Sequence, residues 1–539
     1  MFMAHRWAVA ALTAAAVAVG VTASAATAPV PTLALGPGQV GNDVSWPQCP
    51  VPEGGFGNPP PRDGARFVVI GLTKGAGFTR NPCLDDQVAS AALRGLPAQG
   101  YLVPTYPSAD QLSQYGAQGP WKATTTAGRL LNVGYAEAAD ALAAAAGAGF
   151  TPPAVWVDVE RSRPGTQWPE GDTAAAAANR LVVLGVLRRL DEAGVRAGLY
   201  SASDAWAGLT GGWRVPGTPL WVTAGRRDRA AAEALCTKGA GWGGGPVHLA
   251  QWFDDSYDDD VTCPPFALRP ARPRPPSSPS DTGNDIDANW ASDLVARQAS
   301  DGTLWLYPQD AASGAWRRRV KLATGWRTYD IVLTPGDVDQ DGVPDLLARR
   351  GDDLWLFPVR ASGALGSRVK VGSGWRRYDA IVGAGDLTGD DVPDLLARDR
   401  AGGLWLVPRT APLYGKPGWG KPVRFSTGWR GYGLLTGAGD LTGDGHADLV
   451  ARAADGTLHL FAGTGRSWQP LAKPVTILKG WRAVDALVGP GDVDRDGLPD
   501  LLLREKSTGT LWRLSRSESG SWQRPVRIST GWRGFDALS

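Results

Sequence analysis

The feature that most constrains the fold of this chain is an acidic nine-residue segment that occurs five times in its C-terminal half. The copies read DIDANWASD from Asp285, DVDQDGVPD from Asp337, DLTGDDVPD from Asp386, DLTGDGHAD from Asp440 and DVDRDGLPD from Asp492. Each copy is followed by an apolar run such as DLLAR, a glycine-containing turn and a second apolar run such as LWLFPV. A unit of about fifty residues that repeats in this way is typical of a propeller or a solenoid.

A second recurring segment predicts how the repeats close into a ring. Each acidic turn after the first is preceded by a predicted strand that begins Gly-Trp-Arg, centred on Trp326, Trp375, Trp429 and Trp481. The first turn has no such strand before it, whereas the chain ends with a surplus copy, GWRGFDALS, around Trp532. We expect this last copy to complete the first blade and to remove the open strand edges. The prediction is an all-β propeller of five four-stranded blades over residues 281–539.

The acidic turns carry oxygen ligands at offsets 0, 2, 4 and 8, which suits a hard cation that takes six or more oxygens, and calcium is the expected ion. Threonine replaces the second carboxylate in the third and fourth copies, so weaker binding is expected there. The expected ligands of structural calcium are Asp285, Asp287, Asn289 and Asp293; Asp337, Asp339, Asp341 and Asp345; Asp386, Thr388, Asp390 and Asp394; Asp440, Thr442, Asp444 and Asp448; and Asp492, Asp494, Asp496 and Asp500.

These turns resemble the FG-GAP/VCBS repeats of integrin-type propellers, from about Asp281 to the C-terminus. Tryptophans also recur along the blades, and alternation with aliphatic residues favours a packing role for Trp305, Trp355, Trp405 and Trp512. Stacking of sugars on the Gly-Trp-Arg segments at the blade junctions is the alternative interpretation.

The N-terminus reads as a secretory signal over residues 1–28. A cationic tip at His5 and Arg6 precedes an apolar run from Trp7, and small residues follow, with cleavage expected after Ala25 or Ala28. A membrane anchor is disfavoured because prolines and small residues follow the apolar run instead of a charged flank. The expected product is a secreted, extracellular protein without membrane insertion.

Export would place the four cysteines in an oxidising environment, where disulfides form. All four precede the Pro-rich linker expected at residues 264–280. Four cysteines allow three pairings, and the neighbouring predicted strands favour two disulfides that join Cys49 with Cys83 and Cys236 with Cys263. The formal net charge of +2 gives little support to a nucleic-acid function. A monomer is expected.

Residues 38–263 alternate short apolar runs with alanine-rich amphipathic segments, a pattern that predicts an irregular (β/α) TIM-like barrel lacking its last helices. Its most informative segment is Val155-Trp156-Val157-Asp158-Val159-Glu160. Alternation along a strand points the valines toward the surrounding helices and Trp156, Asp158 and Glu160 into the barrel. Two inward carboxylates at the C-terminal end of a strand lie where barrel enzymes place their chemistry.

Such a pair suits glycoside hydrolysis, which needs one carboxylic acid and a second carboxylate. Same-face neighbours on a strand lie roughly 6.5–7 Å apart at the backbone, which permits the short carboxyl spacing of a retaining reaction. Mutual repulsion and burial are expected to raise one pKa, leaving an acid beside a base. Calcium sites and loop caps use the same spacing, so the pair alone is weak evidence.

The segments GNDVSWPQC, VVIGLTKGAGFTRNPCLDDQ, VWVDVE, GLYS and AQW…DDDVTC resemble those of glycoside hydrolase family 25 lysozymes. The resemblance implies Glu160 as general acid, Asp158 as partner carboxylate, Asp43 as first-strand acid and Asp260 as the late acid, with Asp258 as a rival. The aromatic faces that could stack on sugars are Trp46, Tyr106, Trp156, Tyr200 and Trp252, although Trp252 is at least as well explained by core packing.

The leading hypothesis is therefore a secreted muramidase-like hydrolase of peptidoglycan, with the propeller bound to wall or surface glycans and no cofactor needed for catalysis. The alternative is a non-catalytic wall-binding or adhesion protein that keeps a degenerate hydrolase barrel. A Ser/His/Asp mechanism is disfavoured because His248 is the one histidine left in the first domain after export.

Overall fold

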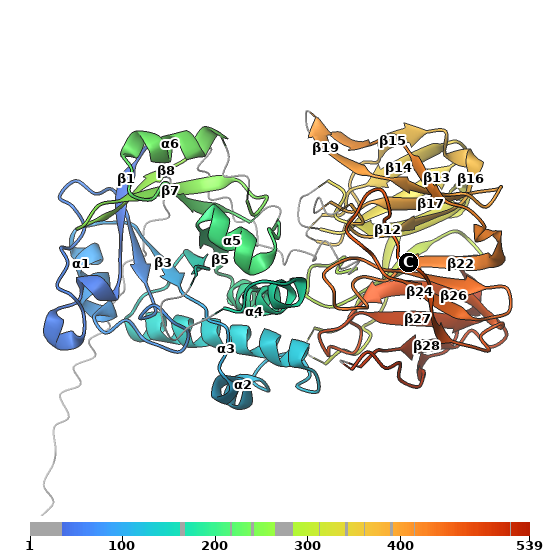
Figure 1. Ribbon diagram of the computed structural model, residues 1–539, viewed down its shortest axis with the longest axis horizontal. Helices are drawn as coiled ribbons and strands as arrows, with labels where there is room; N and C mark the ends of the chain where they lie inside the picture. The colour runs from blue at the N-terminus through green and yellow to red at the C-terminus, as the bar shows by residue number, and fades with distance from the viewer. Residues whose placement is uncertain are drawn as a thin grey trace, which may run out of the picture. The chain divides into compact units, whose positions relative to one another are not determined.

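A computed structural model describes residues 35–161, 168–215, 218–238, 242–264, 284–311, 313–339, 343–360, 362–388, 392–413, 416–517 and 519–539 (Figure 1). The predicted signal lies outside these residues, as does the predicted linker except for Pro264. The described chain forms a closed barrel followed by a propeller, and each is considered by itself. None of the helices in the described part of the chain is long and apolar enough to cross a membrane.

The first part is a closed barrel, as the sequence predicts, and the structure shows that it has eight strands. The strands are β1 (Val40–Val44), β2 (Val68–Gly71), β3 (Ala98–Leu102), β4 (Ala154–Asp158), β5 (Arg196–Ser201), β6 (Leu220–Thr223), β7 (Val247–Phe253) and β8 (Asp258–Thr262). The helices are α1 (Leu84–Leu93), α2 (Ala109–Tyr115), α3 (Thr126–Gly147), α4 (Thr173–Glu192), α5 (Ser203–Thr210) and α6 (Arg229–Lys238).

The barrel departs from the regular TIM-like pattern because its sheet is mixed. Strands β1 to β7 are parallel, but β8 runs antiparallel to both of its neighbours, β7 and β1. Only four residues, 254–257, join β7 to β8, too few for a helical crossover. Two short 3-10 turns, η1 (Trp46–Gln48) and η2 (Val51–Glu53), lie between β1 and β2.

Strand β4 follows the predicted alternation. Val155, Val157 and Val159 are fully buried and belong to the core between strands and helices. Trp156 instead packs with aromatic and aliphatic residues of the barrel interior, including Trp221. The strand therefore turns its other face, the one that ends in Asp158, toward the inside of the barrel.

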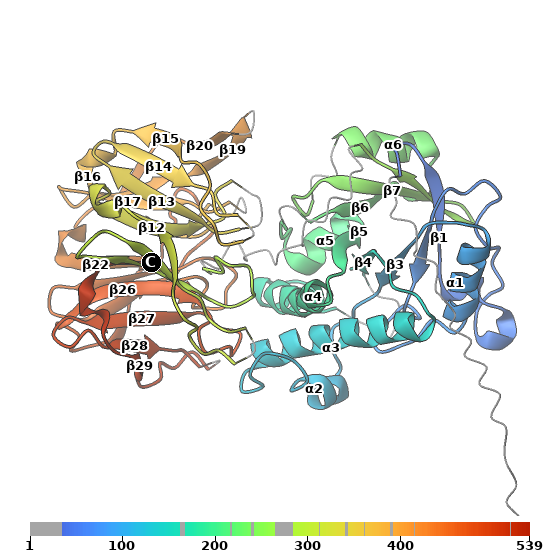
Figure 2. The same cartoon turned by 180° about the vertical axis from the view of Figure 1, so that it is seen from behind.

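Helices α3 and α4 lie side by side along the barrel, as Figure 2 shows. Two glycines permit this close approach. A Cβ on Gly134 would lie 1.9 Å from the Val182 carbonyl oxygen, and one on Gly185 would lie 2.0 Å from that of Leu131. Both distances are far below contact, so larger residues would force the helices apart.

Both favoured disulfides are present in the structure. Cys49 and Cys83 have Cα atoms 5.5 Å apart, and those of Cys236 and Cys263 are 5.1 Å apart, within the usual range for a bridge. The first disulfide ties the segment after β1 to the start of α1, and the second ties α6 to the end of β8. The described residues contain no free cysteine.

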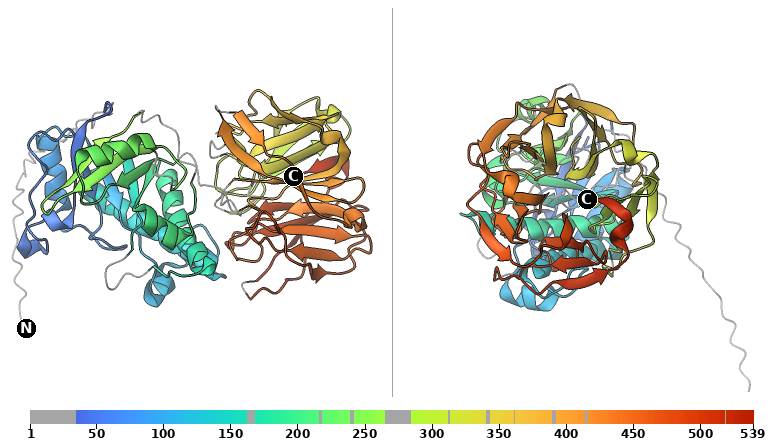
Figure 3. Two further views of the ribbon diagram at one scale, coloured as in Figure 1. Left: turned by 45° about the horizontal axis from the view of Figure 1, so that its top comes forward. Right: turned by 90° about the vertical axis from the view of Figure 1, so that its right-hand side faces the viewer.

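The second part is a propeller of five four-stranded blades, which the right-hand view of Figure 3 shows as a ring. Blade 1 consists of β30 (Phe535–Leu538), β9 (Leu294–Gln298), β10 (Leu304–Tyr307) and β11 (Val320–Ala323); blade 2 of β12 (Ile331–Gly336), β13 (Asp345–Arg350), β14 (Asp353–Phe357) and β15 (Val369–Ser373); blade 3 of β16 (Tyr378–Gly383), β17 (Leu395–Asp399), β18 (Leu404–Val407) and β21 (Val423–Ser426); blade 4 of β22 (Tyr432–Gly437), β23 (Leu449–Ala453), β24 (Leu458–Phe461) and β25 (Val475–Leu478); and blade 5 of β26 (Val484–Gly491), β27 (Asp500–Glu505), β28 (Leu511–Leu514) and β29 (Val526–Ser529). A separate two-stranded hairpin, β19 (Arg409–Leu413) and β20 (Lys416–Trp419), is inserted in the chain between β18 and β21 of blade 3.

The predicted closure is confirmed. Strand β30 pairs antiparallel with β9, so the last segment of the chain supplies a strand of the first blade. Ser539 and Val295 extend this pairing with two backbone hydrogen bonds of 2.9 and 2.8 Å. Blade 1 is thereby built from the two ends of the repeat region.

The Gly-Trp-Arg segments do not begin strands, which corrects the sequence prediction. The glycines Gly325, Gly374, Gly428 and Gly531 have φ of 79 to 90°, and the tryptophan after each starts the 3-10 turns η3 (Trp326–Thr328), η4 (Trp375–Arg377), η5 (Trp429–Gly431) and η6 (Trp532–Gly534). These four tryptophans are only 3–5% exposed. They pack between blades and leave no face for a sugar, so the stacking interpretation of these four segments is wrong.

An arginine that sequence reasoning missed connects each blade to the next. Arg349 of β13 donates from Nη1 to the carbonyl oxygens of Trp375 (3.0 Å) and Tyr378 (2.5 Å), and from Nη2 to Asp330 of its own blade (2.6 Å). The equivalent arginines are Arg297, Arg398, Arg452 and Arg504, each bonded to the turn at the start of the following blade.

Candidate functional site

The acidic pair predicted from the sequence lies at the C-terminal end of β4. Asp158 is the last residue of this strand and is half-buried, whereas Glu160 is exposed. The Val159 amide donates to the Tyr200 carbonyl oxygen at 2.9 Å, so the β4–β5 pairing continues past the strand end. Burial first, and then the charges of Glu160 and Asp43, raise the pKa of Asp158 well above its usual value. The Oδ1 atom of Asp158 is buried and has no hydrogen-bond partner within the described part of the chain.

Asp43 enters the same cluster from β1 and is held by a two-step hydrogen-bond chain. Gln251 Nε2 donates to Asp43 Oδ2 at 2.8 Å, and Tyr200 Oη donates to Gln251 Oε1, also at 2.8 Å. Asp43 is 8% exposed. Burial, followed by the charge of Asp258, raises its pKa well above the usual value. The barrel therefore favours the protonated form of Asp43 more than water would.

The late carboxylates lie on β8, at different depths. Asp258 pairs across the sheet with Asp43, and burial together with the charges of Asp259 and Asp254 raises its pKa to about 6. Asp260 is fully buried and accepts a hydrogen bond from Trp221 Nε1 at 2.8 Å. Since β8 runs antiparallel to the other strands, its first residues are nearest the mouth, and Asp258 is the more accessible of the two candidates.

Arg62, which the sequence analysis did not single out, organises the turn that joins β7 to β8. Its Nε donates to Asp259 at 2.9 Å, and its Nη2 donates to Asp254 at 3.0 Å. The guanidinium also lies 3.7 Å from the ring centre of Tyr257. No sequence pattern links this arginine to residues almost two hundred positions later, so only the fold shows the connection.

The predicted sugar-stacking residues differ in how much of their surface is available. Trp156 is 2% exposed and donates from Nε1 to Gln99, and Tyr200 is 7% exposed, so neither presents a face to a ligand. Trp46 and Tyr106 are half-buried. Trp252 packs against the core between strands and helices, in agreement with a packing role.

In the propeller, the last aspartate of each acidic turn organises its backbone. Asp345 Oδ2 accepts hydrogen bonds from the amides of Val338 (2.9 Å) and Asp339 (3.1 Å), and its Oδ1 accepts one from Val359 (3.0 Å). The equivalent buried residues are Asp293, Asp394, Asp448 and Asp500, which accept amide hydrogen bonds in the same way.

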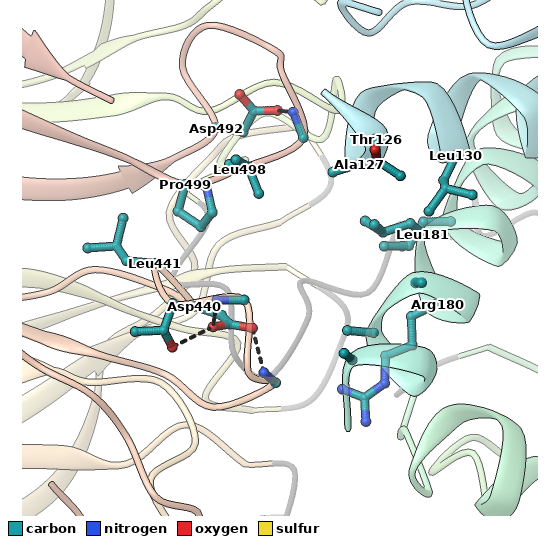
Figure 4. Close-up of a pocket in the computed structure, with 18 of the residues that line it drawn as sticks. Thr126, Ala127, Leu130, Arg180, Leu181, Asp440, Leu441, Asp492, Leu498 and Pro499 are labelled. Atoms are coloured by element: carbon teal, nitrogen blue, oxygen red, sulfur yellow. Dashed lines mark hydrogen bonds between the residues drawn. The ribbon is translucent and has the colours of Figure 1, made fainter. Parts of the chain in front are cut away.

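The first aspartate caps the turn from the other side. Figure 4 shows the Asp440 carboxylate with hydrogen bonds from its own turn; the Gly443 and Gly445 amides both donate at 2.7 Å. Asp492 accepts from Gly497 at 2.8 Å in the same manner.

Among the residues that the structure describes, three of the turns bring three carboxylates together. Single oxygens of each group lie within 4.8 Å of one another in Asp285, Asp287 and Asp293, in Asp337, Asp339 and Asp345, and in Asp492, Asp494 and Asp500. The remaining predicted ligands behave differently: the Thr388 and Thr442 hydroxyls donate to the first aspartate of their turns, and Asn289 donates to the Gln309 carbonyl oxygen. Asp496 and Asp444 each accept an amide hydrogen bond within the turn. Asp341 and Asp390 lie outside the described residues.

Comparison with known proteins gives the following similarities. A family model described as FG-GAP-like repeat matches residues 440–503, which include the fourth and fifth acidic turns. No curated protein is similar enough to match the chain.

Among solved structures, a muramidase from Acremonium alcalophilum shares 15% identity over 42% of this chain and 93% of its own, with a TM-score of 0.27. A family GH25 lysozyme from Aspergillus fumigatus shares 16% identity over 42% of this chain and 95% of its own, with a TM-score of 0.25. The lectin BP39L from Burkholderia pseudomallei shares 14% identity over 44% of this chain and 70% of its own, with a TM-score of 0.29.

Proposed function

We propose that this protein is a secreted glycoside hydrolase of the muramidase type, which cleaves the β-1,4 glycan of peptidoglycan and holds to wall glycans through its propeller. The observation that carries the proposal is the cluster of carboxyl groups of Asp43, Asp158 and Glu160 at the C-terminal ends of the barrel strands β1 and β4, where the charges of Glu160 and Asp43 act on Asp158. Glycoside hydrolysis requires one protonated and one ionised carboxyl group within reach of the same bond.

The geometry supports a division of roles within the cluster. Burial, and then the charge of Glu160, raise the pKa of Asp158, so the two carboxyl groups do not ionise independently of each other. Glu160 is the exposed member, so a glycosidic oxygen can reach it and receive the proton. Asp158 supplies negative charge next to the developing sugar cation once the proton of the pair lies on Glu160. Gln251 fixes the position of Asp43 through its amide.

The test compares clearing of a peptidoglycan suspension by the full-length protein and by Glu160→Gln. The variant keeps the shape of the side chain but cannot deliver a proton, so we expect the rate to fall by about 10²–10⁴. Glu233→Gln, which changes a surface carboxylate of α6, is the matched control and should clear at the wild-type rate. Equal clearing by the wild type and Glu160→Gln contradicts the proposal. Retention of the wild type on the wall without clearing would instead support the adhesion alternative.

We also propose that the acidic turns of blades 1 and 2 bind structural calcium. Their three-carboxylate groups supply the hard oxygen donors that calcium prefers. Burial and the charges of Asp339 and Asp337 raise the pKa of Asp345 well above its usual value, a cost that a bound cation would relieve.

Removal of calcium should therefore destabilise the propeller. Calcium at about a hundred times its Kd stabilises by about 2.7 kcal/mol per site, or roughly 5–10 °C in Tm for a domain of this size. Scanning calorimetry of the full chain in calcium and in EGTA measures the shift. A propeller transition at the same temperature in both buffers would show that these turns hold their shape without the ion.

A further inference from the structure

The fifth acidic turn differs from the others through a residue that lies outside its sequence motif. Position 513 on β28 pairs with Leu502 of β27, and the same register in the other blades places a leucine there. These buried residues are Leu306, Leu356, Leu406 and Leu460. In blade 5 the residue is Arg513, so one blade of the ring carries a cation where the rest carry a hydrocarbon.

The guanidinium of Arg513 reaches into the carboxylate group of its own blade. Its Nη2 lies 2.7 Å from Asp494 Oδ2, and its Nε lies 4.0 Å from Asp500 Oδ2. All three side chains are shielded from water, with 16%, 8% and 1% of their surfaces exposed, respectively. The two groups therefore form a close ion pair that is shielded from water, where opposite charges attract more strongly than in solvent.

This arrangement does not fit a calcium ion. Calcium needs six to eight oxygens at about 2.3–2.6 Å, and Asp494 Oδ2 already forms an ion pair with the guanidinium of Arg513. An ion bound to this oxygen would lie close to the guanidinium in a shielded environment, where like charges repel strongly.

We propose that Arg513 takes the place of calcium in blade 5, so that the fifth turn folds around its own side-chain cation and binds no metal. The motif DVDRDGLPD gives no sign of this, because the arginine follows the last aspartate of the motif by thirteen positions and lies beyond the segment that matches the repeat family. The inference goes beyond the calcium role proposed for blades 1 and 2 and is tested separately from it.

The first experiment replaces Arg513 with the residue of the other blades. Calcium stoichiometry is measured on the full-length protein by isothermal titration calorimetry, with folding checked by circular dichroism. We expect Arg513→Leu to bind one more calcium ion per chain than the wild type and to show a larger Tm difference between calcium and EGTA. Arg527→Leu, which removes an exposed arginine of the neighbouring β29, is the control and should leave the stoichiometry unchanged.

A second pair of variants keeps the test decisive if Arg513→Leu fails to fold. Asp494→Asn and Asp339→Asn change the same position of the fifth and second turns. We expect Asp494→Asn to keep the wild-type stoichiometry, because no ion is lost, and Asp339→Asn to lose one ion.

The outcomes separate the two proposals. Loss of one ion in Asp494→Asn, or unchanged stoichiometry in folded Arg513→Leu, would overturn the role of Arg513 while leaving the calcium sites of blades 1 and 2 intact. If the wild type binds no calcium but Arg513→Leu binds one ion, the calcium role of the other turns fails and that of Arg513 stands.

Discussion

Glu137 of α3 illustrates how strongly the barrel perturbs a single carboxyl group. It is 2% exposed, and its Oε1 accepts hydrogen bonds from the Thr105 amide (3.2 Å) and hydroxyl (3.0 Å). Gly77 lies so close that a Cβ there would be 1.8 Å from Oε1. Burial outweighs these hydrogen bonds and raises the pKa of Glu137 from 4.5 to about 8. The folded barrel therefore favours the neutral form of this carboxyl group at pH 7.

This shift predicts a pH dependence of stability. The folded pKa lies above the unfolded one, so the folded state binds the extra proton, and its stability falls as pH rises from about 4.5 through about 8. Glu137→Gln resembles the protonated form and removes this dependence. We expect the variant to gain several °C in the barrel Tm relative to wild type between pH 6 and pH 9, measured by calorimetry in matched buffers. Parallel curves for the two proteins would show that Glu137 does not titrate in this range.

At the scale of the strand and turn, the interblade arginines explain how neighbouring blades stay in register. Each arginine ties the second strand of one blade to the turn that opens the next, and four of the five also pair with an aspartate of their own blade. Blade 4 has Gly433 in place of that aspartate, and the Nε of its Arg452 is buried without a hydrogen-bond partner among the described residues. A buried donor left unpaired costs about 1–3 kcal/mol.

Gly433→Asp should supply the missing partner. The Cβ would lie 3.1 Å from Arg452 Nη2, a flexible group that can adjust. We expect a gain of about 1 kcal/mol, or about 2–4 °C in the Tm of the propeller, measured by calorimetry. The reverse change in blade 5, Asp485→Gly, should lower Tm by a similar amount. A lower Tm in Gly433→Asp, or an unchanged Tm in Asp485→Gly, would contradict a stabilising role of this pairing between blades.

The same scale shows what sequence patterns could and could not predict. Alternation along β4 gave the correct inward and outward faces, and the count of Gly-Trp-Arg segments gave the closing strand. The prediction that these segments begin strands is wrong, because tryptophan favours strands while the preceding glycine, at φ near 90°, forces a turn. Three features depend on residues that meet only after folding. They are the antiparallel direction of β8, the contacts of Arg62 and the ion pair of Arg513 with Asp494. No local spacing encodes them.

For the whole molecule, stability of the ring rests on its closing segment. Trp532 is 5% exposed and packs against Tyr307 and Phe535, with ring centres 4.4 and 5.3 Å away, and its carbonyl oxygen accepts from Arg504. This one segment therefore joins blade 5 to blade 1.

Trp532→Ala should open this junction. Removal of a buried tryptophan costs about 3–5 kcal/mol, so we expect the propeller Tm to fall by about 10 °C while the barrel transition stays in place. Trp468, 70% exposed, provides the matched control, and Trp468→Ala should change Tm by less than about 1 °C. Equal effects of the two substitutions would argue against closure as the source of ring stability.

The pairing of β30 with β9 also sets the order of events during biosynthesis. Strand β9 emerges from the ribosome more than two hundred residues before the partner that completes its sheet. Until that partner arrives, blade 1 keeps an unpaired inner edge and the assembly stays an open arc. A chain that ends anywhere before β30 therefore lacks a closed ring. The ring can close only after β30 has been synthesised.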